Sequence, residues 1–179
     1  MGNSGNGNSR KMKVLIVLLG VITMAAVSVT IWALFFREDS PVLAPDYAPV
    51  EKEEYAESIP GDSGDKMVSP KGGGSVSLTY SNRVSIDLSD KQATLMFVNP
   101  GKSNQDMVIQ IVIQDTVVVQ SGTLEAGNQV KTLDLLEGME KKLAPGGYEG
   151  KFVVFYYSQE NGEKAIVNTD IPVEITVQE

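Results

Sequence analysis

The stretch LAPGGYEGKFVVFYY at residues 143–157 decides the predicted fold. It opens with the turn formers Pro-Gly-Gly and continues from Tyr148 into a run rich in aromatic and β-branched residues, which is typical of a strand. Alternate side chains of a strand point to opposite faces. One face therefore holds Tyr148, Gly150, Phe152, Val154 and Tyr156, and the other holds Glu149, Lys151, Val153, Phe155 and Tyr157.

Alternation of apolar and polar residues continues on both sides of this stretch, and it predicts further short strands. Turn formers such as Asn99-Pro100-Gly101 and Asn161-Gly162 separate them, and only residues 136–143 look helical. The predicted strands lie at 76–80, 84–88, 93–98, 107–114, 116–120, 129–135, 148–157 and 164–177. Seven to nine strands in a domain over residues 75–179 predict an all-β antiparallel sandwich rather than a βαβ fold.

Leu143, Pro145, Gly146 and Tyr148 carry a more specific signal. They resemble the tyrosine corner of Greek-key sandwiches, in which a tyrosine hydroxyl bonds to the backbone a few residues upstream. On these residues, the domain is similar to immunoglobulin-like and fibronectin type III-like domains. The resemblance implies a Greek-key sandwich of 7 to 9 strands. The chain has no cysteine and its one tryptophan, Trp32, lies outside the domain, so an antibody-like variable domain is not expected.

The resemblance also implies that the strands at 107–114 and 148–157 are neighbours, corresponding to strands C and F. Their outer sides would then share a semi-apolar patch on an acidic domain, and exposed patches of this kind often mark protein interfaces. Ordinary strand propensity also places β-branched and aromatic residues on a solvated face, so both interpretations stay open. The candidate partner-binding residues are Val108, Val112, Val153, Phe155 and Tyr157.

Residues 14–36 form a run of 23 residues without a charged side chain. As a helix this run reaches roughly 35 Å, enough to cross a hydrocarbon core of about 30 Å. It is longer than the apolar region of a signal peptide and lacks a small-residue cleavage site, which favours an uncleaved anchor. Arg10, Lys11 and Lys13 precede the run, so we expect residues 1–13 to be a cytoplasmic tail and residues after 36 to be extracellular.

Residues 37–74 separate this predicted transmembrane helix from the domain and contain five prolines, an acidic cluster and a terminal Gly-Gly-Gly. Such a composition buries too little apolar surface to offset the entropy of ordering. We therefore expect a disordered extracellular tether. Residues 37–179 hold 12 basic and 23 acidic side chains, a net charge of −11, which argues against nucleic acid or an anionic membrane surface as partner.

The chain has no cysteine and no histidine, so the commonest general base and the usual zinc and copper ligands are absent. We expect no enzyme activity, no catalytic residues, no metal and no cofactor. Asp87 and Asp90 lack the ligand pattern of a calcium loop. An isopeptide bond between Lys151 and Asn168 is disfavoured because Lys151 falls on the outer face.

The arrangement of basic tail, apolar span, acidic linker and terminal sandwich resembles small membrane-anchored surface proteins of Gram-positive bacteria. Residues 99–104 (NPGKSN) and the Pro-Gly-Gly-Tyr corner are also similar to accessory proteins of conjugative elements. These resemblances imply a single-pass binding or assembly module that docks to a protein partner in a larger cell-envelope complex. The alternative is a membrane-tethered carbohydrate-binding or carboxylate-dependent hydrolytic surface protein.

Overall fold

The computed structural model describes residues 6–35, 43–62, 64–68 and 74–179. The chain divides into two compact units, Met1–Pro41 and Val42–Glu179. The described part of the first unit is helical, and the second unit contains the described strands.

The helix of the first unit is α1 (Asn6–Phe35). Its segment Lys11–Ser28 has a mean hydropathy of 1.9, and the side chains of this segment are exposed. By length and composition, α1 can cross a membrane or act as an export signal. It begins within the predicted tail and covers residues 14–35 of the predicted span, while residue 36 lies outside the described residues.

The second unit is mostly β, as the sequence predicts. The short helix predicted at residues 136–143 corresponds to a single 3₁₀ turn, η1 (Met139–Lys141). The strands are β1 (Glu57–Ser58), β2 (Thr79–Tyr80), β3 (Arg83–Asp87), β4 (Gln92–Asn99), β5 (Gln105–Ile113), β6 (Thr116–Gln120), β7 (Asn128–Asp134), β8 (Gly146–Ser158) and β9 (Lys164–Gln178).

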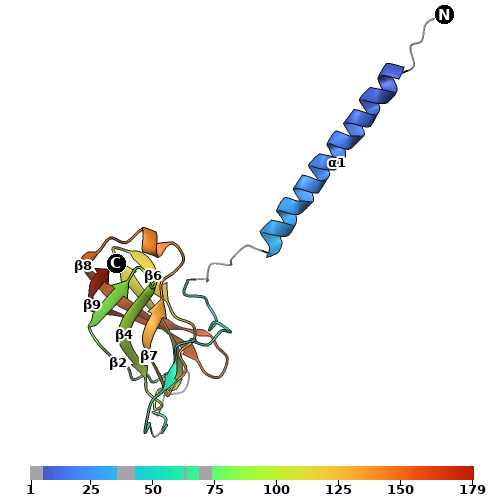
Figure 1. Ribbon diagram of the computed structural model, residues 1–179. Coiled ribbons are helices and arrows are strands. Elements are labelled where there is room, and N and C mark those ends of the chain that lie inside the picture. The colour runs from blue at the N-terminus through green and yellow to red at the C-terminus, as the bar shows by residue number, and fades with distance from the viewer. Residues whose placement is uncertain (1–5, 36–42, 63, 69–73) are drawn as a thin grey trace, which may run out of the picture. The chain divides into compact units, whose positions relative to one another are not determined.

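These strands form one sheet in the order β1-β7-β4-β3-β9-β8-β5-β6, with β2 paired to β4. The sheet curls over, so that β4 and β7 form one layer and β8 and β9 cross behind it (Figure 1). β3 pairs antiparallel with β4 but parallel with β9. The sheet is therefore of mixed orientation, and the prediction of a purely antiparallel sheet is wrong at this pair. Alternation of side chains specifies the two faces of a strand but not the direction of its neighbour.

The core lies between the two layers. Phe97 of β4 and Phe152 of β8 meet across it, with ring centroids 5.7 Å apart and an interplanar angle of 82°. This edge-to-face arrangement is favoured by the aromatic quadrupole. The predicted inner faces of two strands are confirmed, because the core contains Met107, Ile109, Ile111 and Ile113 of β5 and Phe152, Val154 and Tyr156 of β8.

The predicted structural corner lies at the start of β8. The Tyr148 hydroxyl donates to the Ala144 carbonyl oxygen at 2.8 Å, four residues upstream. Leu143 and Tyr148 are partly buried and pack against the core, whereas Pro145 and Gly146 are exposed. This hydrogen bond is the one expected of a tyrosine corner, and it fixes how the chain enters β8.

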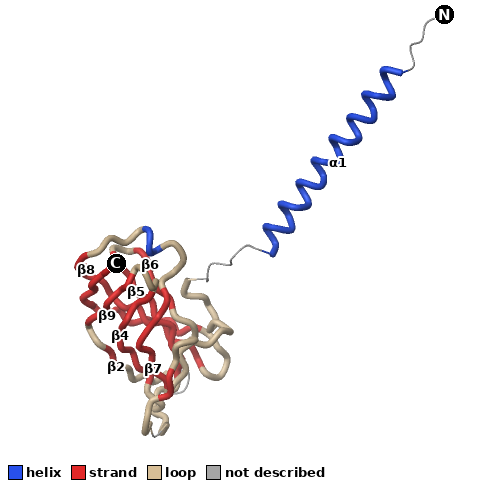
Figure 2. Tube along the Cα trace, viewed as in Figure 1, coloured by secondary structure: helices blue, strands red, loops and turns tan. Residues whose placement is uncertain are grey.

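The structure differs from the predicted disordered tether at residues 43–62. This segment belongs to the same compact unit as the strands, and it contains β1, which pairs with β7 at the edge of the sheet. Figure 2 draws most of it as loop running beside the strands. Its prolines and acidic residues do not prevent order because the segment bonds to the domain rather than folding by itself. Of the rest of the predicted tether, residues 64–68 and 74 are described, and residues 37–42, 63 and 69–73 lie outside the described residues.

Candidate functional site

The predicted partner-binding patch occupies the outer side of β5 and β8, but this side is largely buried. Val108 and Tyr157 have no exposed surface, Val112 and Val153 are each 7% exposed, and Phe155 is partly buried. The prediction of an exposed patch at these five residues is therefore wrong. Residues 43–62, called the strap below, bond to the strands on either side of β5.

The first part of the strap bonds to β6, β8 and β9. The Ala44 amide donates to the Gln120 side chain at 3.1 Å, and the Tyr157 hydroxyl donates to the Pro45 carbonyl at 3.0 Å. Lys164 donates through its ammonium to the Ala44 carbonyl at 2.7 Å and through its amide to the Asp46 carbonyl at 2.9 Å. Because β6 and β8 flank β5, these bonds place the strap across the outer side of β5.

The second part of the strap bonds to the loop between β6 and β7. The Thr123 hydroxyl donates to the Pro49 carbonyl at 2.8 Å, and the Thr123 amide donates to the Glu51 carbonyl at 3.0 Å. The Gly122 amide donates to the Glu53 carboxylate at 2.8 Å. Thr123 is 7% exposed, so its polar groups are satisfied by the strap rather than by water.

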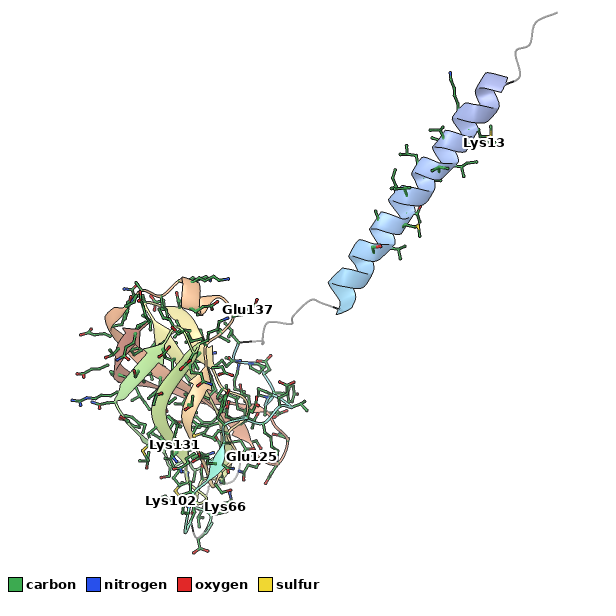
Figure 3. All side chains as sticks on the ribbon, viewed as in Figure 1. Lys13, Lys66, Lys102, Glu125, Lys131 and Glu137 are labelled. Carbon is green, nitrogen blue, oxygen red and sulfur yellow. The ribbon has the colours of Figure 1, made fainter. Side chains whose placement is uncertain are left out.

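Charged and phenolic side chains also hold the strap, both to this loop and to β7. Lys52 pairs with Glu125 at 2.8 Å, and Lys131 pairs with Glu57 at 2.6 Å; Figure 3 labels Glu125 and Lys131. The Tyr55 hydroxyl donates to the Asp134 carboxylate at 3.1 Å. These pairs are exposed and screened by solvent, so they set the register of the strap more than its strength.

The strap ends at Asp62, whose carboxylate accepts hydrogen bonds from the amides of Gly101 and Gly64. These amides, with Gly101 the stronger influence, lower the pKa of Asp62 below its ordinary value. This end contact is therefore present above the ordinary carboxyl pKa and is lost as the pH falls through the lowered one. Beyond it, Lys66 donates to the Ser103 carbonyl at 2.7 Å, at the end of the domain where Figure 3 labels Lys66 and Lys102.

The ionisation of Tyr157 makes the docking of the strap depend on pH. Burial, followed by the nearby Asp46, raises the pKa of Tyr157 from 10.0 to about 12. A phenol with a raised folded-state pKa contributes stability that is fully present below pH 10.0 and is lost as the pH rises through about 12. The phenolate also lacks the proton that bonds the Pro45 carbonyl.

We therefore expect the strap to detach from the domain as the pH rises from 10.0 to about 12. The measurement is phenolate absorbance together with proteolysis of the strap at stepwise pH. Tyr157→Phe should remove the ionisation step nearest pH 12 and should leave the rest of the titration in place. A strap that stays protected after Tyr157 ionises contradicts the expectation.

The strap and the start of β9 carry strongly exposed apolar side chains. Val50 and Ile166 are fully exposed, and Val167 and Tyr47 are 68% and 61% exposed. Tyr47 forms a β-bridge with Glu163, which brings the two segments side by side. The register of β8 and β9 shifts between Phe155 and Tyr157, where β9 has extra residues, among them the exposed Ile166 and Val167. We call Leu43, Tyr47, Val50, Ile166 and Val167 the apolar rim.

A shallow pocket lies at the other end of the outer side of β5 and β8. Lys151 and Asp170 form an ion pair across it at 2.7 Å, which raises the pKa of Lys151. Its lining residues are Val112, Gln114, Asp115, Glu149, Gly150, Lys151, Asp170 and Pro172. Within the described residues, no group of three or more acidic side chains has the geometry of a metal site. Lys151 bonds to Asp170 rather than to Asn168, the partner that an isopeptide bond would require.

The strap residues and their anchors Gly122, Thr123 and Lys164 are absent from the sequence-based candidates. One signal could have revealed a cover over the outer side of β5. Val108, Val112 and Val153 make that side as apolar as many inner sides, and an apolar side normally has something packed against it.

No protein-family model and no curated protein matches the sequence. Among solved structures, the chain is similar to AggA, the major subunit of aggregative adherence fimbriae type I from Escherichia coli. The TM-score is 0.29 and the identity 9%, over 60% of this chain and 97% of that one. A protein of unknown function from Porphyromonas gingivalis W83 gives a TM-score of 0.26 and 19% identity, over 56% of this chain and 47% of that one. At similarity this low, neither likeness carries information on what the chain binds.

Proposed function

We propose that this chain is a membrane-anchored, extracytoplasmic binding or assembly module. In this proposal α1 is a single-pass anchor, because its apolar segment is long enough to span and its exposed side chains need an apolar surrounding. Arg10, Lys11 and Lys13 favour a cytoplasmic amino terminus. The acidic remainder of the chain, at a net charge of −11, then lies outside.

We also propose that the domain is an immunoglobulin-like Greek-key sandwich. Two features support this assignment. β3 pairs with β4 on one side and with β9 on the other, so a single strand joins the two layers. The Tyr148 hydroxyl bonds to the Ala144 carbonyl, as in a tyrosine corner. Such sandwiches support many unrelated activities, so the function must be argued from the surface.

The observation that carries the proposed function is the apolar rim. Fully exposed valine and isoleucine side chains are gathered on two adjoining segments of an otherwise acidic unit, and grouped exposed apolar residues mark protein contacts. Excess negative charge disfavours nucleic acid as the partner. The proposed partner is therefore a protein of a larger cell-envelope complex. The resemblance at residues 99–104 directs the first search toward conjugative transfer machinery.

The test is in-cell photo-crosslinking from Val167 in the full-length, membrane-inserted chain. We expect a defined cell-envelope protein to be captured, and Ile166→Asp to remove the capture because a charge in a buried contact must be desolvated. Met96→Asp is the matched control, since Met96 is also an exposed apolar residue but lies on β4 in the other layer. Capture that survives Ile166→Asp, or that is lost equally in Met96→Asp, would sink the rim as the docking surface.

A further inference from the structure

The domain holds the first half of the strap through the strap's main chain. Five strap carbonyls accept hydrogen bonds from the domain: those of Ala44, Pro45, Asp46, Pro49 and Glu51. The donors are the Tyr157 hydroxyl and the side chain and amide of both Lys164 and Thr123. Two of the five carbonyls belong to proline, which brings no amide hydrogen that would need a partner. This pattern recognises a peptide by its backbone carbonyls.

The larger apolar side chains of this half of the strap contribute little to its docking. Leu43 is 47% exposed, Tyr47 is 61% exposed and Val50 is fully exposed. The first half of the strap is therefore held by hydrogen bonds, with its small residues Ala44, Pro45, Ala48 and Pro49 partly buried, and not by large apolar anchors. Each bond depends only on the strap's sequence and geometry, so an identical strap from a second chain can make every one of them.

The connection between the strap and β2 is rich in glycine. Gly61 lies near the end of the strap, and residues 63–78, which connect the strap to β2, include Gly64 and the run 72–74. Gly61 and Gly64 have positive φ values of 74° and 67°, a region that glycine enters without strain. A glycine-rich connection allows a segment to leave its own domain and dock on another, which is the geometry of segment exchange.

We propose that the groove holding the strap accepts the strap of a second copy of this chain, so that neighbouring copies exchange straps. The second copy is the occupant that the structure favours because it supplies the backbone, prolines and charged residues that fit this groove. The proposal rests on the proposed function in one respect. A strap docks on its own domain at an effective concentration of about millimolar. The strap of a second copy reaches a comparable local concentration only when the copies are gathered in one membrane assembly, as the proposed function requires.

The cysteine-free sequence makes the exchange measurable. Tyr47 and Glu163 are antiparallel β-bridge partners, and both are exposed. Partners of this kind lie about 4.5–5.5 Å apart at Cα, within the range of a disulfide. A chain carrying both Tyr47→Cys and Glu163→Cys should oxidise to a monomer with an internal disulfide, which shows that the cysteine pair reports on the docked strap.

The test co-expresses two full-length, differently tagged chains, one with Tyr47→Cys and the other with Glu163→Cys. We expect a mixed disulfide dimer about tenfold above a control pair that combines Tyr47→Cys with Asp90→Cys, an exposed site on the turn after β3. Adding Gly122→Val to the Glu163→Cys copy should abolish the dimer, because this change blocks the groove.

Two results would overturn the proposal. One is an internal disulfide in the double variant with no mixed dimer above the control pair. The other is a Glu163→Cys chain that captures a different protein in place of the tagged copy. The mixed disulfide needs only two copies of this chain. It therefore tests strap exchange independently of the crosslinking experiment, which tests for an envelope partner.

Discussion

Replacing Gly122 by valine should release the strap while leaving the core intact. A Cβ at position 122 would lie 2.9 Å from the Glu53 amide nitrogen and the Lys52 carbonyl carbon, and 3.0 Å from the Glu51 carbonyl oxygen. All three atoms belong to the strap backbone, so no side-chain rotation relieves the clash. Overpacking typically costs about 1–3 kcal/mol, which lowers the docked population about 5- to 150-fold.

The measurement is limited proteolysis of the full chain in detergent, followed by mapping of the cut sites. In Gly122→Val we expect rapid cleavage within residues 43–62, and we expect the pKa of Tyr157 to return toward 10.0 as water reaches its ring. The matched control is Gly147→Val, because a Cβ at position 147 would meet no atom within 4 Å. Equal protection of the strap in both variants would contradict the docking contacts described above.

Phe152→Ala should cause the largest loss of stability in the domain. The Phe152 side chain has no exposed surface, and its ring packs edge-on against Phe97 at 5.7 Å and Tyr80 at 6.5 Å. Removing a fully buried phenylalanine leaves a cavity between the two layers. Such changes cost about 3–5 kcal/mol, a large share of the roughly 5–15 kcal/mol that stabilises a typical domain.

The measurement is chemical denaturation of the full chain in detergent, monitored by a probe in the second unit. Phe155→Ala is the matched control, since Phe155 is the same residue type on the same strand but faces the outer side and is only partly buried. We expect a clearly smaller loss for this variant. Losses of equal size would mean that the inner and outer sides of β8 do not differ in the way that the burial pattern indicates.

Local patterns predicted the strands well because burial on one side of a strand leaves a trace in every second residue. β6 lies at the predicted residues 116–120, and β9 (Lys164–Gln178) extends the predicted strand by one residue. The inner faces of β5 and β8 followed from the same alternation. The parallel pairing of β3 with β9 could not be predicted in this way, because direction depends on how the whole chain is routed.

The strap escaped prediction for a different reason. Composition predicts disorder when a segment cannot bury enough of its own apolar surface, and the strap satisfies that rule. It is ordered instead by hydrogen bonds from Thr123, Tyr157 and Lys164, which are far away in the sequence and form no recognisable motif. The candidate patch failed for the same reason, since the cover over Tyr157 lies more than a hundred residues before it in the chain.

The order of the strap's contacts along the chain leads us to expect that mechanical load would detach the strap first. Its first contacts, at Ala44 and Pro45, are nearest to the amino-terminal helix in sequence, so tension applied through that helix reaches them before the later contacts. Bonds loaded one after another separate at low force, and residues 43–56, which precede β1, would release roughly 45–50 Å of chain before the sheet bears the load. Re-docking of the strap after the load is removed would shorten the chain again. The strap would then act as a segment that extends under load and docks again when the load is removed.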